Sequence, residues 1–272
     1  MNKAATKGAL IEVDRVYVER DLTSILEDLC WSVYPGENWI IFGPNGAGKT
    51  SLLNVIQGYL WPTSGTIRVL GGELGNGVDV REMRRVISVV SEPVRNMINE
   101  SLSGLEVLVT GARAHLNLFD IPTSSELERA KALASHTRIE SLLGKPFAVM
   151  STGERQRLLI TRALMPIPKV LILDEPCAGL DLAGREWVLQ TIEMIARQHS
   201  APVLLLTTHH VEEVTPAFTH ALLLKAGRKF DAGNIETVFT SARVSELFDI
   251  DVRLSRHNDR YSVSAAQKPH KK

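Results

Sequence analysis

Residues 43–51 have the sequence GPNGAGKTS, which matches the pattern of a phosphate-binding loop. The loop follows the apolar run NWIIF at 38–42 and opens the helix-period run KTSLLNVI at 49–56. Its three glycines allow successive backbone N–H groups to turn inward, toward an anion at the positive end of a helix. The sequence therefore predicts a site for the phosphates of a nucleotide.

The residues of this loop have separate predicted tasks. Lys49 supplies a mobile cation for the β- and γ-phosphates, and Thr50 supplies a hydroxyl ligand for Mg²⁺. The alternative is a flexible glycine turn, but a bare match arises in only about one chain in a hundred of this length, and here a strand and a helix flank it. The predicted nucleotide contacts are Gly43, Pro44, Asn45, Gly46, Ala47, Gly48, Lys49, Thr50 and Ser51.

The hydrophobic pattern around the loop is that of an α/β protein with a P-loop core and a mostly parallel central sheet. Residues 11–42 alternate as in an antiparallel β layer that leads into a buried strand. Apolar strands within 168–176 and 201–210 flank a helix-period stretch at 182–198, the spacing of parallel strands joined by a crossover. Residues 93–165 have a helical period, so we expect an all-helical insertion there.

Shorter stretches complete the pattern. A hairpin with glycine turns is predicted at 63–75, a buried strand at 84–91, and a last pair of short strands at 220–233. Residues 254–272 become polar and basic, and we expect a loosely held tail there.

The composition excludes several classes of protein. The 272 residues include 31 Lys and Arg against 31 Asp and Glu, so the chain is not a generally basic nucleic-acid coat or a polybasic membrane anchor. Its apolar runs are far shorter than the roughly 18 residues of a membrane-spanning helix. The start of the chain has no apolar signal region, and Cys30 and Cys177 do not make a disulfide framework. We expect a protein of the reducing cytoplasm that binds no nucleic acid.

Two acidic residues follow the apolar strand VLIL at 170–173. Asp174 and Glu175 lie at its carboxyl end, the edge at which open α/β sheets bind ligands. Asp174 would hold Mg²⁺ through the ion's water shell, and Glu175 would orient or deprotonate the attacking water. Adjacent acids at a strand end are on their own more often a solvated turn, but together with a P-loop they favour a catalytic pair.

His209 lies at the end of the strand VLLLTT, residues 203–208. An imidazole there could hydrogen-bond a γ-phosphate and respond to its loss. The alternatives are a surface histidine, or a metal site made with His210, Glu212 and Glu213. We discount the metal site because adjacent histidines at one strand end are expected to point apart and no third nitrogen ligand is close in sequence.

The segment MSTGERQR, residues 150–157, permits two interpretations. Ser151 followed three residues later by Glu154 is a capping box, which satisfies the first N–H groups of a helix. A helix start that contains Gly153 is also an anion site. The two interpretations are compatible, and capping is the commoner use of such a motif.

The motifs GPNGAGKT, STGERQR, LILDEP, AGLD and TTHH, in this order, resemble the nucleotide-binding domain of an ABC-type ATPase over roughly residues 10–240, with 241–272 as a short C-terminal extension. The resemblance implies a head-to-tail dimer in which each P-loop site is completed by the signature helix of the other copy. Ser151 and Gly153 would then reach the γ-phosphate of the other copy's nucleotide. Asp181 would touch the opposite site, and Glu175 would be the general base.

Details of three segments narrow the resemblance. TGERQRLLITRALM, DEPCAGLD and SELFDIDV are similar to the subgroup assigned to molybdate-type or metal-chelate uptake, some members of which are labelled photorepair proteins. This narrower likeness says little about cargo.

Some positions depart from the family pattern. Thr152 stands where a second glycine is usual, and Glu154 where a glutamine is usual; the added carboxylate could weaken anion binding or be occupied in the cap. The family's Mg²⁺-ligating glutamine is missing, and either Glu92 or Arg95 takes its place. Of these two, only the carboxylate of Glu92 could ligate the ion.

The resemblance implies the ATP-binding and ATP-hydrolysing subunit of an ABC transporter. It would use ATP and Mg²⁺, pair with a second copy of itself and power a separate integral membrane permease from the inner face of the cell membrane. Tyr17 is the candidate for stacking on adenine, with a role in the core as the alternative. The alternative function is a soluble stand-alone ABC ATPase with a regulatory or repair-associated role.

Overall fold

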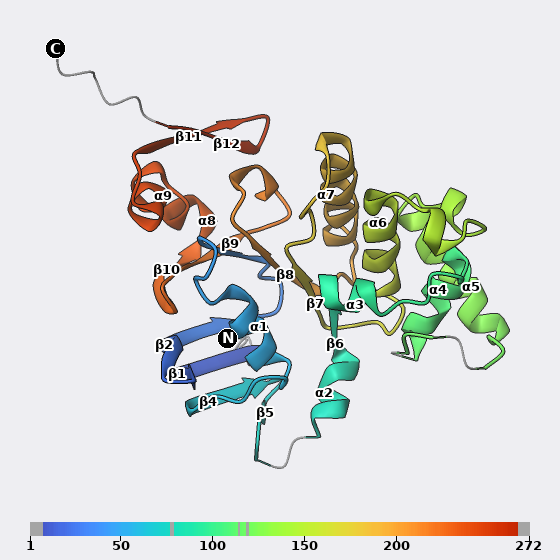
Figure 1. Ribbon diagram of the computed structural model, residues 1–272, viewed down its shortest axis with the longest axis horizontal. Coiled ribbons are helices and arrows are strands. Elements are labelled where there is room, and N and C mark those ends of the chain that lie inside the picture. Colours follow the sequence, from blue (N-terminus) through green and yellow to red (C-terminus); the bar gives the residue numbers. More distant parts are fainter. Residues whose placement is uncertain (1–7, 77–78, 114, 118–119, 266–272) are drawn as a thin grey trace, which may run out of the picture. The chain divides into compact units, whose positions relative to one another are not determined.

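The computed structural model describes residues 8–76, 79–113, 115–117 and 120–265. The chain divides into two compact units (Figure 1), a first unit within 1–83 and 207–272 and a second unit within 84–206.

The first unit contains an antiparallel sheet with the strand order β2-β1-β4-β5. Its strands are β1 (Ile11–Arg20), β2 (Thr23–Val33), β4 (Ser64–Val69) and β5 (Gly72–Glu73). The longer strands lie side by side in Figure 1, and β1 alternates buried and exposed residues because only one face is covered. The antiparallel layer and the hairpin predicted from the sequence are therefore confirmed.

A second group of strands in the first unit has the order β10-β9-β3. β3 (Trp39–Phe42) runs parallel to β9 (His220–Lys225), and β9 forms an antiparallel hairpin with β10 (Arg228–Asn234). All four residues of β3 are buried, which is typical of a parallel strand covered on both faces. The P-loop follows directly from this strand, and α1 (Lys49–Ile56) follows the P-loop.

The C-terminal part of the first unit is more ordered than the sequence predicted. Helices α8 (Ile235–Val238) and α9 (Ser241–Phe248) precede two antiparallel strands, β11 (Val252–His257) and β12 (Arg260–Ala265). The expectation of a loosely held tail from residue 254 is therefore wrong for residues 254–265. Polar composition was misleading because both strands of this hairpin are mostly exposed.

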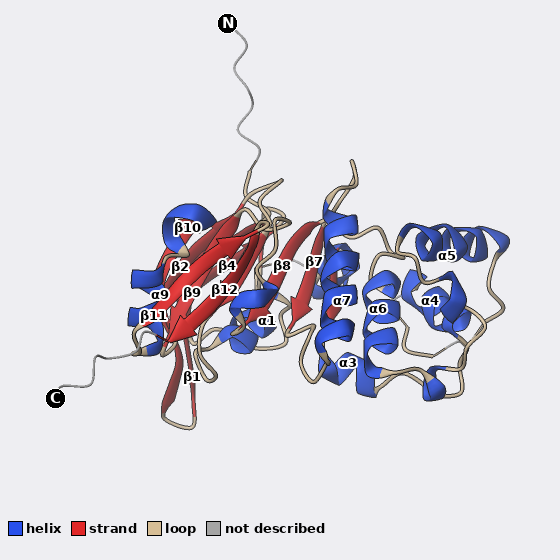
Figure 2. Ribbon diagram, turned by 90° about the horizontal axis from the view of Figure 1, so that it is seen from above, coloured by secondary structure: helices blue, strands red, loops and turns tan. Residues whose placement is uncertain are grey.

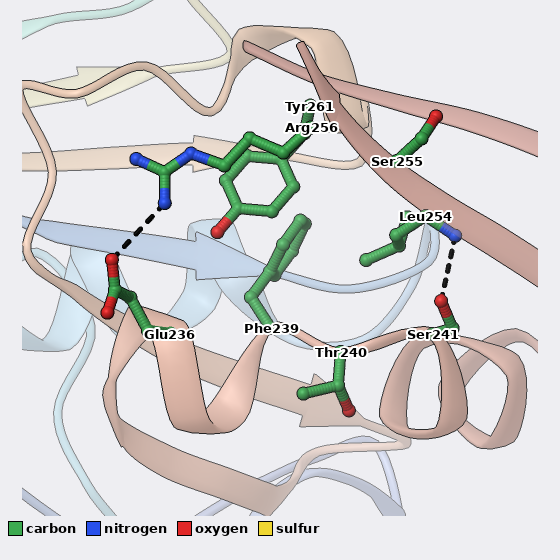
Figure 3. A pocket seen from close by; sticks show the side chains of 8 residues that line it. All are labelled: Glu236, Phe239, Thr240, Ser241, Leu254, Ser255, Arg256 and Tyr261. Atoms are coloured by element: carbon green, nitrogen blue, oxygen red, sulfur yellow. Dashed lines mark hydrogen bonds and ion pairs between the residues drawn. The ribbon is translucent and has the colours of Figure 1, made fainter. Parts of the chain in front are cut away.

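Side-chain contacts hold this hairpin, since an isolated two-stranded hairpin is only marginally stable. Phe239 and Tyr261 meet edge to face with ring centroids 5.2 Å apart. The backbone N–H of Leu254 donates to the Ser241 hydroxyl at 2.9 Å, and the Arg256 guanidinium donates to Glu236 at 3.2 Å. These contacts surround an open pocket of about 440 Å³ (Figure 3).

The second unit contains the strand order β8-β7-β6. β6 (Ile87–Val90) runs parallel to β7 (Val170–Asp174), and β8 (Val203–Thr208) ends within the first unit. The strand predicted at 84–91 is shorter than expected because α2 (Val80–Val86) includes its first residues. The extended part, ISVV at 87–90, is rich in the β-branched residues that favour strands.

Helices fill most of the rest of the second unit, as the sequence predicted for 93–165. α6 lies beside both α7 and α4 (Figure 2). The elements are α3 (Glu92–Asn96), α4 (Gly104–Ala112), α5 (Ser124–His136), η1 (Glu140–Leu142), η2 (Phe147–Val149), α6 (Thr152–Arg162) and α7 (Leu182–Ala196).

A buried arginine joins α4 to α6. The Nε of Arg162 donates to the Thr110 hydroxyl at 2.9 Å, and its Nη2 donates to the carbonyl of His115. Burial lowers the pKa of Arg162 to about 10, so the group still carries its charge at neutral pH. A Cβ on Gly111 would lie 2.4 Å from the Arg162 carbonyl oxygen, so the glycine is what permits this close approach.

Three helices of this segment begin with the same local device. Ser103 with Glu106, Thr123 with Glu126, and Ser151 with Glu154 each form a capping box that satisfies backbone N–H groups at a helix start. None of the described helices of the chain is long and apolar enough to cross a membrane.

We expect acid to weaken these helix starts in a defined pH range. The Arg113 guanidinium and the Thr123 N–H lower the pKa of Glu126 from 4.5 to about 2. A carboxyl whose pKa is lowered on folding stabilises the fold above its unfolded pKa, and this contribution is lost as the pH falls through the folded pKa. The helical signal at 222 nm should therefore decline as the pH falls from 4.5 to about 2.

Glu126→Gln should make this decline smaller, because glutamine can still cap but does not titrate. Glu128→Gln is the matched control, since Glu128 is exposed on the same helix and makes no cap. Identical acid titrations of the two variants by circular dichroism would contradict the assignment.

Candidate functional site

The P-loop has the conformation that its glycines were expected to permit. Gly46 has φ 78° and Gly48 has φ 97°, in the left-handed region that other residues rarely adopt. Gly48 is also the N-cap of α1, and no acidic residue lies in the first turn of that helix. The helix start therefore presents backbone N–H groups and a positive dipole end to an anion, with no carboxylate in its own first turn to compete.

The ammonium group of Lys49 lies inside this loop. The residue is 5% exposed, and its Nζ donates to the carbonyl oxygens of Gly43 at 2.9 Å and Pro44 at 3.1 Å. A buried ammonium requires such acceptors because its desolvation is costly. The loop thus holds a positive charge next to the helix start.

Backbone contacts within the first unit support the loop. A Cβ on Gly43 would lie 2.2 Å from the Leu224 carbonyl oxygen of β9, so only glycine fits there. Gly227, in the turn after β9, donates its N–H to the Ala47 carbonyl at 3.1 Å and accepts from the Glu27 N–H at 2.9 Å. Sequence analysis missed Gly227, because its signal was an ordinary glycine turn between two short strands.

His209 lies close to the loop in the first unit. The Gly43 N–H donates to the Thr208 carbonyl at 3.4 Å, so the residue before His209 is hydrogen-bonded to the first residue of the loop. The rings of His209 and His210 contact each other, with centroids 4.1 Å apart and planes tilted by 38°. The expectation that these side chains point apart is therefore wrong. The Thr208 hydroxyl accepts from the His210 N–H at 2.9 Å and turns the chain back at this point.

Tyr17 lies on β1, opposite Ser64 of β4. Its side chain is 41% exposed, so the alternative of a core role does not hold. An exposed ring in the first unit is free of the packing that would prevent stacking on a flat ligand.

Asp174 and Glu175 lie at the carboxyl end of β7 in the second unit, as predicted. The strand is buried up to Leu173, and both acids are half-buried. Glu175 has φ 46° although it precedes Pro176, a combination that is sterically unfavourable for a residue with a Cβ. Its carbonyl accepts from the Ala178 N–H at 3.1 Å, which fixes the turn after the strand.

The segment at the start of α6 forms the predicted capping box. The Ser151 hydroxyl accepts from the Glu154 N–H at 3.2 Å, and a Glu154 carboxylate oxygen accepts from the Ser151 N–H at 2.8 Å. The same oxygen accepts from the Lys145 Nζ at 2.7 Å, an ion pair that sequence analysis missed. This lysine lowers the pKa of Glu154, so its carboxylate is both ionised and neutralised by a local partner.

Asp181 caps α7. Its carboxylate accepts from the Gly184 N–H at 2.7 Å. A Cβ on Gly153 would lie 3.3 Å from the Gly184 Cα, so the starts of α6 and α7 are in close contact. The structure thus brings together Ser151, Gly153 and Asp181 within the second unit.

The region after β6 begins a short helix, α3, which starts one residue before the helical insertion predicted from residue 93. Ser91 is the N-cap of α3, and Pro93 is in its first turn. Glu92 and Arg95 are one turn apart on this helix and form an ion pair at 3.0 Å. Both candidates for the missing glutamine are therefore bonded to each other, and Glu92 remains the only one that could ligate Mg²⁺.

Comparisons with known proteins agree with this geometry. The family model described as ABC transporter matches residues 26–178, which include the P-loop and both acidic residues after β7. The chain belongs to the ABC transporter family. The uncharacterized ABC transporter ATP-binding protein YlmA of Bacillus subtilis (strain 168) is 39% identical over 95% of this chain and 98% of that protein.

Solved structures show the same fold. The structure of cbiO1 from Clostridium perfringens, part of the ABC transporter complex cbiONQ, has a TM-score of 0.76 and 27% identity, covering 88% of this chain and 93% of that one. A dimeric post-hydrolysis state of the ATP-binding cassette MJ0796 with ADP and Pi has a TM-score of 0.68 and 20% identity, covering 83% of this chain and 98% of that one. The predicted fold class, an α/β P-loop fold with an antiparallel layer, is confirmed. This ABC protein is an ATP-binding, ATP-hydrolysing subunit of an ABC transporter.

Gly227→Ala should weaken nucleotide binding although the residue lies outside the P-loop. Its φ is 77°, and a Cβ would lie 2.5 Å from the Ile25 carbonyl oxygen, so the turn must shift and with it the bond to Ala47. We expect ATP affinity by calorimetry to fall by at least about tenfold, or about 1.4 kcal/mol.

Gly71→Ala is the matched control for this variant. Gly71 has a φ of 82°, but a Cβ there meets nothing within 4 Å. Both variants share the conformational cost of the left-handed region, and only Gly227→Ala adds a backbone clash. Equal ATP affinities in the two variants would show that Gly227 does not support the loop.

Proposed function

We propose that this ABC subunit binds ATP with Mg²⁺ on its P-loop, hydrolyses it in a head-to-tail dimer with a second copy, and powers a separate membrane permease. The observation that carries the proposal is the buried ammonium of Lys49, held at the start of α1 by the Gly43 and Pro44 carbonyls.

Triphosphate binding uses groups of the first unit. The N–H groups around Gly46 and Gly48 would surround the β-phosphate, and the Lys49 ammonium would exchange its carbonyl acceptors for phosphate oxygens. Tyr17 offers an exposed ring for the adenine. His209, next to the residue that is bonded to Gly43, would hydrogen-bond the γ-phosphate.

The oxygen donors of the chain fit Mg²⁺. The Thr50 hydroxyl and the Asp174 carboxylate are hard ligands, of the type that this ion prefers, and both residues are accessible to solvent. Glu92, in the second unit, would add a second carboxylate, but it is already paired with Arg95. When bound, Mg²⁺ neutralises charge on the β- and γ-phosphates.

Glu175 is the proposed general base. Its left-handed backbone, which costs on the order of 1–3 kcal/mol, turns the chain out of the strand line directly after Asp174. Strained backbone of this kind is concentrated at functional sites. The carboxylate would accept a proton from the water that attacks the γ-phosphorus, while the bond to the β-phosphate oxygen breaks.

A second copy would complete the site through the start of α6. Ser151 is exposed at the N-cap, and Gly153 and Asp181 lie beside it. A helix start of this kind favours a phosphate group. The MJ0796 cassette was solved as a dimer with ADP and Pi, which supports the same arrangement here.

The permease partner is proposed from the relatives. YlmA is named an ABC transporter ATP-binding protein, and cbiO1 is part of an ABC transporter complex. An ATPase subunit of this kind requires a partner that forms the membrane path, so the chain would work at the inner face of the membrane. Co-purification of the subunit from membranes with a second, apolar chain would support the permease partner. Recovery of the subunit without any second chain from every membrane extract would contradict it.

Glu175→Gln and Lys49→Ala should fail in different ways. Glu175→Gln removes the base but leaves the P-loop intact, so turnover should fall by roughly 10³, about 4 kcal/mol of transition-state stabilisation, while ATP still binds. Lys49→Ala should abolish ATP binding itself. Phosphate release and calorimetry separate the two. Near-normal turnover of Glu175→Gln, or unchanged ATP affinity of Lys49→Ala, would refute the respective role.

Ser151→Arg tests the dimer. A bulky cation at this helix start should block the other copy's γ-phosphate, so ATPase activity should be lost while ATP affinity of the single chain is kept. Ser151→Thr is the control, because threonine also caps a helix. If Ser151→Arg hydrolyses ATP at the normal rate, the second copy does not contribute this segment.

A further inference from the structure

A small cavity in the second unit has three arginines among its seven lining residues. It has a volume of about 230 Å³, and its walls include Arg138, Arg157, Arg197, Trp187 and Glu193. Arg157 lies on α6, and Trp187 and Glu193 lie on α7; these two helices are side by side in Figures 1 and 2. We call this the arginine cavity.

The charges in the arginine cavity are unbalanced. Its lining contains three guanidinium groups and a single carboxylate, that of Glu193. Glu193 forms an ion pair with Arg197 at 3.5 Å, one turn along the surface of α7. This pairing leaves two positive charges in the lining without a carboxylate from the lining to balance them.

Arg157 is held in place by neutral acceptors. Its Nη2 donates to the carbonyls of Thr137 at 3.2 Å and Arg138 at 2.8 Å, and its Nε donates to the Thr191 hydroxyl at 3.3 Å. Burial is the main influence on this group and lowers the pKa of Arg157, yet an arginine remains charged at neutral pH. The result is a fixed, half-buried cation at the cavity wall.

Arg138 contributes a second cation. The residue is exposed, follows the C-cap of α5 and has φ 55°, and its guanidinium has no acceptor among the residues that the structure describes. Because the Arg138 carbonyl is bonded to Arg157, the two residues are adjacent at the cavity. Two neighbouring guanidinium groups favour a carboxylate or phosphate, which accepts bidentate hydrogen bonds.

Trp187 supplies a flat apolar surface beside these cations. It is 50% exposed, which is unusual for so large an apolar ring on a helix that packs against another. Indole rings bind flat aromatic groups by stacking. The cavity volume is below the roughly 300–1,000 Å³ of pockets for drug-sized ligands, so its occupant must be small.

We propose that the arginine cavity binds a small organic anion with a flat aromatic ring, its phosphate or carboxylate on Arg138 and Arg157 and its ring on Trp187. The same chemistry is found in nucleoside monophosphates and in aromatic carboxylates. Binding here would give the ATPase subunit a second ligand site, on residues to which the proposed hydrolysis mechanism assigns no role.

The test uses the full chain with Lys49→Ala, so that the P-loop does not take up the probe. 5′-AMP and benzoate carry both an anion and a ring, whereas adenosine lacks the anion and inorganic phosphate lacks the ring. Quenching of tryptophan emission reports the site, because Trp187 lines it. We expect 5′-AMP, benzoate or both to bind with a Kd of about 0.1–1 mM, and adenosine and phosphate to bind at least about tenfold more weakly. The tighter of the two ring-bearing anions identifies the class of ligand.

Variants assign the binding to the cavity. Arg138→Ala should lower the affinity for the anion at least about tenfold, and Trp187→Phe should remove the quenching of tryptophan emission. Arg253→Ala and Trp61→Phe are the matched controls, because both residues are exposed in the first unit. Arg157 is not substituted, since it also holds the carbonyls of Thr137 and Arg138.

Three results would overturn the proposal. These are no binding of either ring-bearing anion up to 10 mM, adenosine binding as tightly as 5′-AMP, and equal affinities in Arg138→Ala and Arg253→Ala. Circular dichroism spectra matching those of the parent chain would show that the variants are folded.

Discussion

The nucleotide loop depends on one buried charge. The Lys49 ammonium is almost fully withdrawn from water, and it is tolerated because the Gly43 and Pro44 carbonyls accept its hydrogen bonds. These carbonyls are held in position because Gly43 lies against the backbone of β9, where no larger residue fits. The loop is therefore shaped by the sheet beneath it, and its positive charge is in position before a ligand contributes any contact.

The functional residues lie where burial of a strand ends. β3 is wholly apolar and buried, and β7 and β8 are apolar and buried as far as Leu173 and Leu206, so a polar side chain within these runs would be costly unless it were hydrogen-bonded. Polar groups appear where each apolar run ends: the P-loop follows β3, Asp174 and Glu175 lie at the end of β7, and His209 follows β8. The hydrophobic pattern that predicts a strand therefore also predicts, at the strand's carboxyl end, where polar residues that bind ligands are placed.

This regularity explains how much the sequence predicts. The P-loop, the acidic pair after β7 and the capping box of Ser151 follow from local patterns, because the groups that satisfy one another are within a few residues. The C-terminal hairpin was missed because its strands are exposed and polar. It is held by contacts such as Phe239 with Tyr261, which periodicity does not reveal.

Other features depend on distances that a local pattern does not contain. The contact between the rings of His209 and His210 accompanies a turn made by the Thr208 hydroxyl, which a simple strand pattern does not include. The short helix α3 begins at Glu92, with Ser91 as its N-cap and Pro93 in its first turn, whereas the sequence pattern indicated only a broad helical region from residue 93. Gly227 supports the P-loop across more than a hundred residues of sequence, and only the fold brings it to Ala47.

The departure at Glu154 has a physical explanation in these contacts. A carboxylate in the first turn of a helix that is to bind phosphate would normally oppose the ligand by like-charge repulsion. Here one Glu154 carboxylate oxygen accepts hydrogen bonds from the Ser151 N–H and the Lys145 ammonium, so the negative charge of Glu154 is neutralised by a neighbouring positive charge. Because the cap and the ion pair use the same oxygen, the helix start keeps its dipole and its exposed Ser151 hydroxyl. A glutamine at this position would cap the helix without requiring Lys145, and therefore the lysine and the carboxylate are best understood as a pair that replaces it.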